Sequence, residues 1–368
     1  MLITIFDGIK DPRKIDQCTY ELGDLLAIAL LTYLCGGEDF PDMAMFARLR
    51  ARDFGLLPYT DRSPSADTFE RLFAILKTDY VERCVVEHGK RIMDVMNEKQ
   101  IAIDGKKECG TAPRLAGPKG DYLLHAWATE NGILLGQEKV RDKENEIPAI
   151  PRLLDRLVID GAVVSIDAMG TQTDIAEKII EKKAHYFLAV KENQGGLLSE
   201  IQDVVRYNAP MSTHAATEKG HARVETRTVS TYPADRMEDK DIFGRWKNLR
   251  TLVCVRAERV HVSEGGRTET QTRYYISDED FPSAQYYGEL ARGHWAVENG
   301  LHWHLDVTFK EDGCRARKKN AAQNLSLLRK LALQIAKHTQ DNLSLRKRLR
   351  CAAWNPQYLI TLLKNYGF

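Results

Sequence analysis

The sequence predicts an α/β protein in which a mixed sheet flanked by helices carries a β-rich insertion and is preceded by an all-helical domain. Three observations lead to this prediction. Apolar residues recur at helical spacing through residues 1–98, and short apolar runs alternate with helical stretches over 99–199. Strand-like runs without intervening helices follow over 200–278. Helical spacing then returns over 279–340, and we expect a helical tail at 341–368.

Composition excludes several classes of protein. A chain of 368 residues with 43% apolar and 29% charged residues has the balance of a globular protein of two or three folding units. Seven cysteines, odd in number and never spaced Cys-x-x-Cys, favour neither a disulfide framework nor a cysteine zinc site. The longest apolar run, Leu25 to Cys35, is too short for a membrane span, and no signal segment opens the chain. We therefore expect no membrane partner and a cytoplasmic, nucleoid-associated location.

The first 98 residues predict a compact helical bundle. One apolar stripe ends at Gly36-Gly37 and a second begins at Met43. The stretch from Pro64 to Asp67 predicts a helix start, with Asp67 as the cap and Glu70 as its capping-box partner. A helix-turn-helix over 39–77 would bring arginines to DNA, although any helical bundle exposes arginines. We take this domain as a candidate for binding DNA ends because of the features that follow downstream.

From residue 99 the period changes to that of a mixed sheet. We expect strands at 100–104, 122–129, 133–140, 163–167 and 185–190, with helices at 147–157 and 174–183. In the insertion we expect strands at 223–232, 249–259 and 268–276.

Two of the predicted strands end in an aspartate. Asp104 closes an apolar run and precedes glycine, and Asp167 repeats the arrangement. Ligand sites of open α/β sheets lie outside the strand ends, and two carboxylates close together repel unless a cation lies between them. Either acid alone is commonly a turn residue. The pair predicts a Mg²⁺ site acting on phosphate esters, because Mg²⁺ prefers oxygen ligands.

A third acid follows on a helix. At helical spacing Glu298 shares a face with His294 and His302. These three residues could alternatively hold zinc, but their spacing differs from that of helical zinc hydrolases. We therefore interpret Glu298 as a third carboxylate for the same site.

Basic charge is concentrated just beyond Glu298. The whole chain has 53 basic and 52 acidic side chains, so nucleic-acid binding requires a local basic surface. Between Lys310 and Arg350 there are twelve Lys or Arg against three Asp or Glu. An isolated stretch of this kind is usually a solvated helical face. Its position next to a candidate catalytic residue favours DNA binding instead.

Together these segments resemble the insertion-sequence DDE transposases, most closely their H-repeat-associated branch, over nearly the whole chain. The resemblance rests on the following motifs: Asp11-Pro12-Arg13, Pro64-Ser65-x-Asp67-Thr68-Phe69, Ile103-Asp104-Gly105-Lys106, Asp167-Ala168-Met169-Gly170-Thr171-Gln172, Lys191-x-Asn193-Gln194 and His294-Trp295-x-Val297-Glu298-Asn299-x-Leu301-His302-Trp303-x-Leu305-Asp306-Val307-x-Phe309-x-Glu311-Asp312.

The resemblance implies an RNase H-like catalytic domain in which Asp104, Asp167 and Glu298 bind two Mg²⁺ ions, with Mn²⁺ able to substitute. It also implies an insertion between the second and third acids. Partners would be double-stranded DNA, as terminal inverted repeats and target, and further copies of the chain on paired DNA ends. Such an enzyme would cleave DNA strands and transfer them.

Contacts to DNA are inferred from charge and proximity. The wider group's Tyr-x-x-Arg-x-x-x-Glu-x-x-x-x-x-x-Lys signature is incomplete, because Ala291, His294 and Leu305 occupy its Tyr, Arg and Lys positions. Its DNA-end contacts therefore do not carry over. The candidate DNA-binding residues are Lys106, Lys191, Arg292, His294, His302, Arg315, Arg317, Lys318 and Lys319.

Two other functions fit the same residues. An RNase H-like nuclease would cut DNA without joining strands, so demonstrated strand transfer would separate it from a transposase. A catalytically silent DNA-binding protein derived from a transposase would bind DNA without cleaving it in Mg²⁺ or Mn²⁺.

Overall fold

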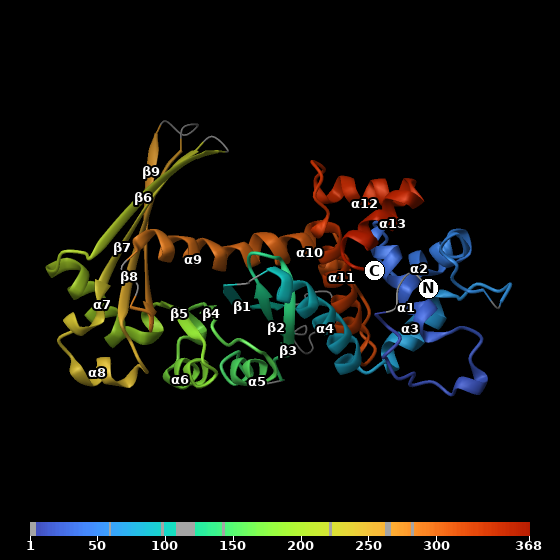
Figure 1. The fold of residues 1–368 in the computed structure, drawn as a ribbon, viewed down its shortest axis with the longest axis horizontal. Helices are drawn as coiled ribbons and strands as arrows, with labels where there is room; N and C mark the ends of the chain where they lie inside the picture. Colours follow the sequence, from blue (N-terminus) through green and yellow to red (C-terminus); the bar gives the residue numbers. More distant parts are fainter. Residues whose placement is uncertain are drawn as a thin grey trace.

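A computed structural model describes residues 5–58, 60–96, 99–107, 122–141, 144–220, 223–261, 266–280 and 283–368, with side chains omitted for 90–96. One sheet runs through the middle of the molecule (Figure 1). Long strands rise from one end of it, and helices from both ends of the chain gather at the other. A single helical path, α9 to α10, connects the two sides.

The helices predicted near the N-terminus are present. They are α1 (Leu22–Leu34), α2 (Phe40–Leu49), α3 (Ala66–Ile75) and α4 (Thr78–Met96). The predicted capping box at α3 is wrong. Ser65 is the N-cap, and its hydroxyl accepts from the Thr68 N–H at 3.3 Å. Because that hydroxyl satisfies the exposed amide, the helix begins at Ala66 and Asp67 already lies inside its first turn.

The expected mixed sheet is confirmed. Its first strands are β1 (Gln100–Lys107), β2 (Tyr122–Ala128), β3 (Ile133–Lys139), β4 (Val163–Ile166) and β5 (His185–Val190). β1 is antiparallel to β2 and parallel to β4, and β4 is parallel to β5. The helices α5 (Ala149–Arg156) and α6 (Thr173–Glu181) supply the connections that parallel strands require.

The β-rich insertion extends this same sheet. Its strands are β6 (Ser212–Gly220), β7 (Arg223–Pro233), β8 (Thr251–His261) and β9 (Arg267–Ser277). β9 pairs antiparallel with β5, which gives the nine-strand order β3-β2-β1-β4-β5-β9-β8-β7-β6. The outer parts of β6–β9 project well beyond the sheet, and we call them the β arm (Figure 1).

The insertion also contains elements that the sequence did not predict. The helices α7 (Gly195–Tyr207) and α8 (Lys240–Arg245) interrupt it, and β6 is an additional strand. β6 is the edge strand and is mostly exposed, so its sequence lacks apolar alternation. α7 buries only Leu197, Ile201 and Val204, a narrow stripe for a helix of its length.

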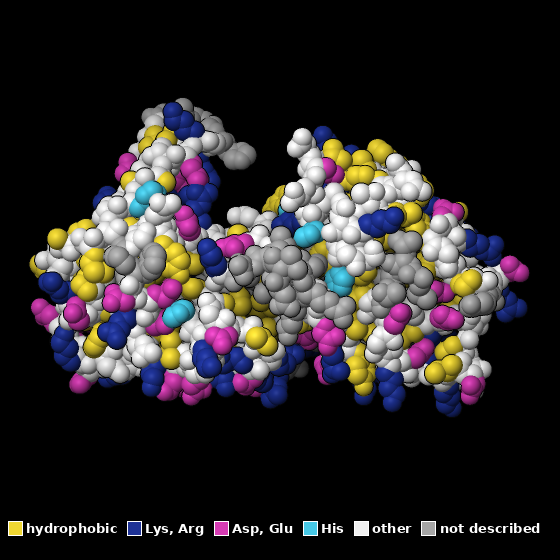
Figure 2. Space-filling model, viewed as in Figure 1, with side chains coloured by type: hydrophobic (Ala, Val, Ile, Leu, Met, Phe, Trp, Pro, Cys, Tyr) yellow, Lys and Arg dark blue, Asp and Glu magenta, His cyan; other side chains and the backbone are white. Residues whose placement is uncertain are grey.

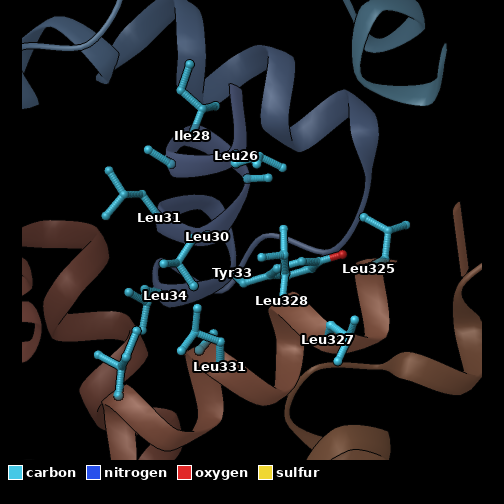
Figure 3. Close-up of a cluster of buried hydrophobic side chains, with 14 of the residues drawn as sticks. Leu26, Ile28, Leu30, Leu31, Tyr33, Leu34, Leu325, Leu327, Leu328 and Leu331 are labelled. Atoms are coloured by element: carbon cyan, nitrogen blue, oxygen red, sulfur yellow. The ribbon is translucent and has the colours of Figure 1, made fainter. Parts of the chain in front are cut away.

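Helices return after the insertion. They are α9 (Ala284–Val297), a π turn (Glu298–His302), α10 (Trp303–Val307), α11 (Ala321–His338), α12 (Leu345–Trp354) and α13 (Pro356–Asn365). Apolar side chains of α1, among them Leu30 and Tyr33, pack against Leu328 and Leu331 of α11 (Figure 3). We call the body formed by α1–α3 and α11–α13 the helical lobe.

Part of the basic charge counted beyond residue 310 lies inside the protein. Arg329 and Lys330 of α11 are 1% and 0% exposed. The guanidinium of Arg329 lies over the ring of Tyr33 at 5.0 Å, so it serves the packing of α1 on α11. The predicted basic surface is therefore smaller than the net charge of the segment implies.

The sequence predicted neither a disulfide framework nor a membrane span. The six cysteines among them are free thiols. No helix in the described ranges is long and apolar enough to cross a membrane.

Candidate active site

One cleft of about 730 Å³ contains all three candidate acids. Its walls come from the middle of β1, the end of β5, the turn after β4, α7, the inner part of β9 and the helical path α9 to α10. The side chains that line it include Asp104, Asp167, Lys191, Gln202, Arg273, His294, Trp295, Glu298 and His302. Segments separated by nearly two hundred residues therefore meet in one place.

Asp104 does not end its strand, as the sequence predicted. β1 continues to Lys107 because β2 goes on pairing with it, and Asp104 lies opposite His125. The parallel neighbour β4, however, pairs only as far as Ile166, opposite Ile103. Asp104 is thus the first residue of β1 beyond the end of β4, and it borders the cleft although it lies within a strand.

Gly105 has a packing role beside Asp104. A Cβ at this position would collide with the ring of Tyr122 on the neighbouring strand. The Gly105 N–H donates to Asp104 Oδ1 at 2.9 Å. The N–H of Gly105 therefore orients the Asp104 carboxylate, and the absence of a side chain at Gly105 leaves room for the ring of Tyr122.

Asp167 follows β4 directly, as predicted, and caps a short 3₁₀ turn (Ala168–Gly170). Its Oδ1 accepts the Met169 N–H at 3.1 Å. The turn is held from the Lys191-x-Asn193-Gln194 motif, since the Asn193 amide donates to Ala168 O at 2.7 Å and the Gln194 amide to Thr171 O at 2.9 Å. The sequence identified this motif but gave no role to its two amides.

Glu298 is the first residue of the π turn and is exposed to the cleft. π turns within α-helices occur frequently at functional sites. The turn is supported from α11, because Lys337 Nζ donates to Gly300 O at 2.6 Å. The preceding helix is seated on the sheet by Gln100, whose amide donates to Ser165 Oγ at 2.8 Å and to Leu290 O at 2.9 Å.

Asp104 is affected by its burial and by the neighbouring acids. The pKa of Asp104 is raised to about 7, chiefly by burial and further by the charges of Asp167, Glu146 and Glu298, while the hydrogen bond from Gly105 opposes the rise. Ionisation of Asp104 is therefore disfavoured in this cleft.

The histidines of the cleft are neutral at neutral pH. Burial lowers the pKa of His294 to about 4, and its Nδ1 lies 3.1 Å from Ser165 Oγ. Burial together with the charges of Lys106 and Lys330 lowers the pKa of His302 to about 3. His302 Nδ1 lies 3.5 Å from Asp104 Oδ2. Both side chains reach the cleft as predicted, but without the positive charge that a phosphate contact of the expected kind requires.

Metal binding can be considered from the donor atoms. The three carboxylates offer the hard oxygen ligands that divalent cations such as Mg²⁺ prefer, and no cysteine lines the cleft. A cation there would also relieve the repulsion that raises the pKa of Asp104. Within the described ranges, no three His, Cys, Asp or Glu side chains are already close enough to hold an ion. The zinc alternative through His294, Glu298 and His302 thus gains no support, and a cation bound by the acids would require side-chain movement.

The candidate DNA contacts divide into groups. Lys191 is exposed and lines the cleft. Arg292 is exposed but forms an ion pair with Glu218 of the β arm. Arg315, Arg317, Lys318 and Lys319 are exposed in the loop before α11, do not line the cleft, and include an ion pair from Lys318 to Glu70 at 3.1 Å.

Lys106 does not face the cleft. Its side chain is 7% exposed, and its Nζ lies 2.7 Å from Asp306 and 3.0 Å from Glu311. Its predicted phosphate contact is wrong for this structure, because two carboxylates already hold the buried ammonium group.

Two further cleft residues were missed by the sequence. The Arg273 guanidinium lies over the ring of Trp295 at 4.2 Å, and both side chains line the cleft. Arg273 belongs to a strand that was predicted, but only the pairing of β9 with β5 brings it beside the acids. No local pattern in the sequence contains that information.

Two families of known proteins match the chain. Residues 111–335 match the family described as "Transposase DDE domain", and residues 3–88 match the domain described as "DDE_Tnp_1-associated". Asp167 and Glu298 lie inside the first match, and Asp104 lies just before it.

The chain is 32% identical to the H repeat-associated putative transposase YhhI of Escherichia coli K12, over 98% of this chain and 96% of that protein. It is also 32% identical to the putative transposase YncI of Escherichia coli O157:H7, over 92% and 88%. A piggyBac transposase synaptic complex with hairpin DNA overlays with a TM-score of 0.44 at 12% identity, covering 98% of this chain and 79% of that chain. On the family match and the full-length relatives, the chain belongs to the DDE transposases.

Proposed function

We propose that the chain cleaves the DNA strands at the ends of an insertion sequence and joins them to target DNA, using Asp104, Asp167 and Glu298. Membership of the family makes it a DNA-processing transposase that uses divalent metal. The observation that carries the finer proposal is that these three acids, from a strand, a turn and a helix, line one cleft.

The cations would be two Mg²⁺, with Mn²⁺ able to substitute, held by the three carboxylates. When bound, they would activate first water and then a DNA 3′-hydroxyl and stabilise the leaving oxygen of an in-line displacement. The Gly105 and Met169 amides orient Asp104 and Asp167. Lys191 and Arg273, which line the same cleft, would bind the phosphates on either side of the reacting one.

The partners would be the terminal inverted repeats of the element and its target DNA, bound by a homo-oligomer that pairs two DNA ends. We assign DNA-end binding to the helical N-terminal segment and to the exposed basic loop 314–320. The place of action would be the nucleoid.

The test is a set of single substitutions, D104N, D167N and E298Q, assayed with DNA that carries the element's terminal repeats. We expect each to reduce Mg²⁺-dependent nicking by at least about a thousandfold, since each removes a carboxylate that would bind the cations, while DNA binding persists. The matched control is E192Q, which neutralises another exposed carboxylate of the same cleft.

Activity that survives all three substitutions would reject the site. Nicking without strand joining by the unaltered chain would indicate a nuclease. DNA binding with neither reaction in Mg²⁺ or Mn²⁺ would indicate a silent DNA-binding protein.

A further inference from the structure

One face of α12 is basic and aromatic and has no role in the site described above. Arg346, Lys347 and Arg350 are exposed, and Trp354 is 78% exposed. Offsets of one, four and eight residues from Arg346 place these side chains on one side of the helix. The other side, with Leu345, Leu349 and Ala352, is buried. The helix therefore presents a continuous stripe outward that its own packing does not need.

The charge of this stripe is not neutralised within the protein. Among the described residues, Arg346, Lys347 and Arg350 have neither an ion-pair nor a hydrogen-bond partner, and α12 contains no acid. Arg348 of the same helix differs, because it is half-buried and its Nε lies 2.7 Å from Asp341. The stripe thus carries three free cations beside an exposed indole.

The position of α12 relates the stripe to the active site. α12 runs along the top of the helical lobe, on the side of the molecule from which the β arm projects (Figure 1). The C-terminal part of α12 is tied to the end of α2, since Nη1 of Arg50, the residue that follows α2, donates to Ala353 O at 2.9 Å. Figure 2 shows an open hollow between the β arm and this lobe. The helical path α9 to α10, which carries Glu298, runs below it.

We propose that the α12 stripe binds the sugar–phosphate backbone of duplex DNA that flanks the phosphate in the cleft. The proposal rests on the function proposed above. The carboxylates of the cleft repel the phosphates of DNA unless cations are bound, and Lys191 and Arg273 lie within the cleft itself, so duplex DNA outside the cleft needs further basic groups to hold it. The stripe offers unpaired cations to phosphates, and Trp354 offers an apolar surface to a deoxyribose. Contacts of this kind position DNA without reading its sequence.

The test compares two triple variants by the salt dependence of DNA binding. R346Q/K347Q/R350Q removes the stripe's charge, and R236Q/R245Q/R250Q removes three exposed arginines near α8, on the opposite side of the molecule. Each phosphate contact contributes about 0.9 to the slope of log K against log salt. We expect the stripe variant to lower that slope by about 2 to 3 and to weaken binding at least about tenfold at 0.1 M salt. The control variant should keep both values.

A second pair of variants separates charge from packing. W354A should weaken binding and leave the salt slope unchanged, and W354F should retain most of the affinity. The difference between the unaltered chain and the stripe variant should disappear on duplexes too short to extend from the cleft to α12. Circular dichroism and thermal unfolding would establish that each variant is folded.

Equal slopes for the two triple variants would overturn the proposal. So would unchanged DNA affinity together with weaker self-association in sedimentation, which would assign the stripe to contacts between copies of the chain. If the unaltered chain binds DNA but does not nick it, the proposed function fails, and the slope comparison still decides the role of α12.

Discussion

At the scale of single residues, the position of Asp104 at the cleft was predictable from the sequence, but the end of its strand was not. An apolar run that ends in Asp-Gly predicted a carboxylate at the border of a sheet, and Asp104 does line the cleft. The predicted end of β1 at Asp104 was wrong. β1 continues to Lys107 because β2 pairs with it that far, and the sequence of β1 alone does not show this pairing. His302 is a similar case, since its helical position predicted that it faces the site, but its burial and neutral state depend on Lys106 and Lys330 from other elements.

The raised pKa of Asp104 predicts how the stability of the metal-free protein depends on pH. The pKa is about 7 in the folded protein and near 3.8 in the unfolded chain. Between pH 4 and 7 the folded protein therefore holds a proton that the unfolded chain has lost, so the free energy of unfolding should fall as the pH rises through this window. D104N should reduce the fall, to which Glu82 and Glu146 also contribute through their raised pKa values, and should stabilise the metal-free protein at pH 8 by roughly 2 to 4 kcal/mol.

The measurement is urea unfolding from pH 4 to 8 with and without Mg²⁺. D203N, at an exposed position on α7, should keep the fall seen in the unaltered chain. Mg²⁺ should stabilise the unaltered protein at pH 8 more than it stabilises D104N. An unaltered chain whose stability is flat between pH 4 and 7 would contradict the raised pKa of Asp104.

At the scale of elements, strong local patterns predicted most helices and strands. The alternation of strands and helices between residues 99 and 199 predicted α5 and α6 and the strands beside them. β6 was missed because an exposed edge strand needs no apolar alternation. The π turn at Glu298 also leaves no local pattern, since it depends on support from Lys337 of α11. Both β6 and the π turn therefore depend on contacts with other parts of the fold.

The buried pair Lys106–Glu311 should hold β1 against the segment that follows α10. Burial opposes ionisation of Glu311, but Lys330 and Lys106 outweigh it and lower its pKa to about 2. K106M removes one of these cations and leaves the carboxylate, 3% exposed, with Ser326 Oγ at 2.8 Å and Lys330 nearby. We expect it to lower the free energy of unfolding by about 3 kcal/mol, because an incompletely paired buried charge remains.

A double-mutant cycle with E311L measures the coupling of this pair. K106M/E311L should be more stable than K106M, since the buried charge is then gone as well. K107Q, at the exposed neighbouring position, should change stability by no more than about 0.5 kcal/mol. Additive effects of the two single substitutions would show that Lys106 and Glu311 act independently.

At the scale of the whole molecule, the helices of the first 98 residues share a hydrophobic core with α11 and α13. This core includes Leu30, Leu72, Leu328 and Leu362, so it joins segments from both ends of the chain (Figure 3). Amphipathic stripes predicted each helix, but a stripe does not name the surface that covers it. The sequence could therefore predict a helical bundle at the N-terminus, but it could not show that α11 and α13, beyond residue 320, complete the core of that bundle.

This shared core predicts that residues 1–98 alone do not fold cooperatively, because the face of α1 that packs on α11 would be exposed to water. In the full chain, L328A, at a fully buried position, should lower the free energy of unfolding by about 2 to 5 kcal/mol. It should also expose the N-terminal helices to protease together with α11. L49A, at a leucine that is 63% exposed, should change stability by no more than about 0.5 kcal/mol. Circular dichroism, urea unfolding and limited proteolysis measure these effects. A cooperative unfolding transition in the isolated fragment would instead make the N-terminal segment an independent domain, whose DNA binding could then be assayed apart from the catalytic cleft.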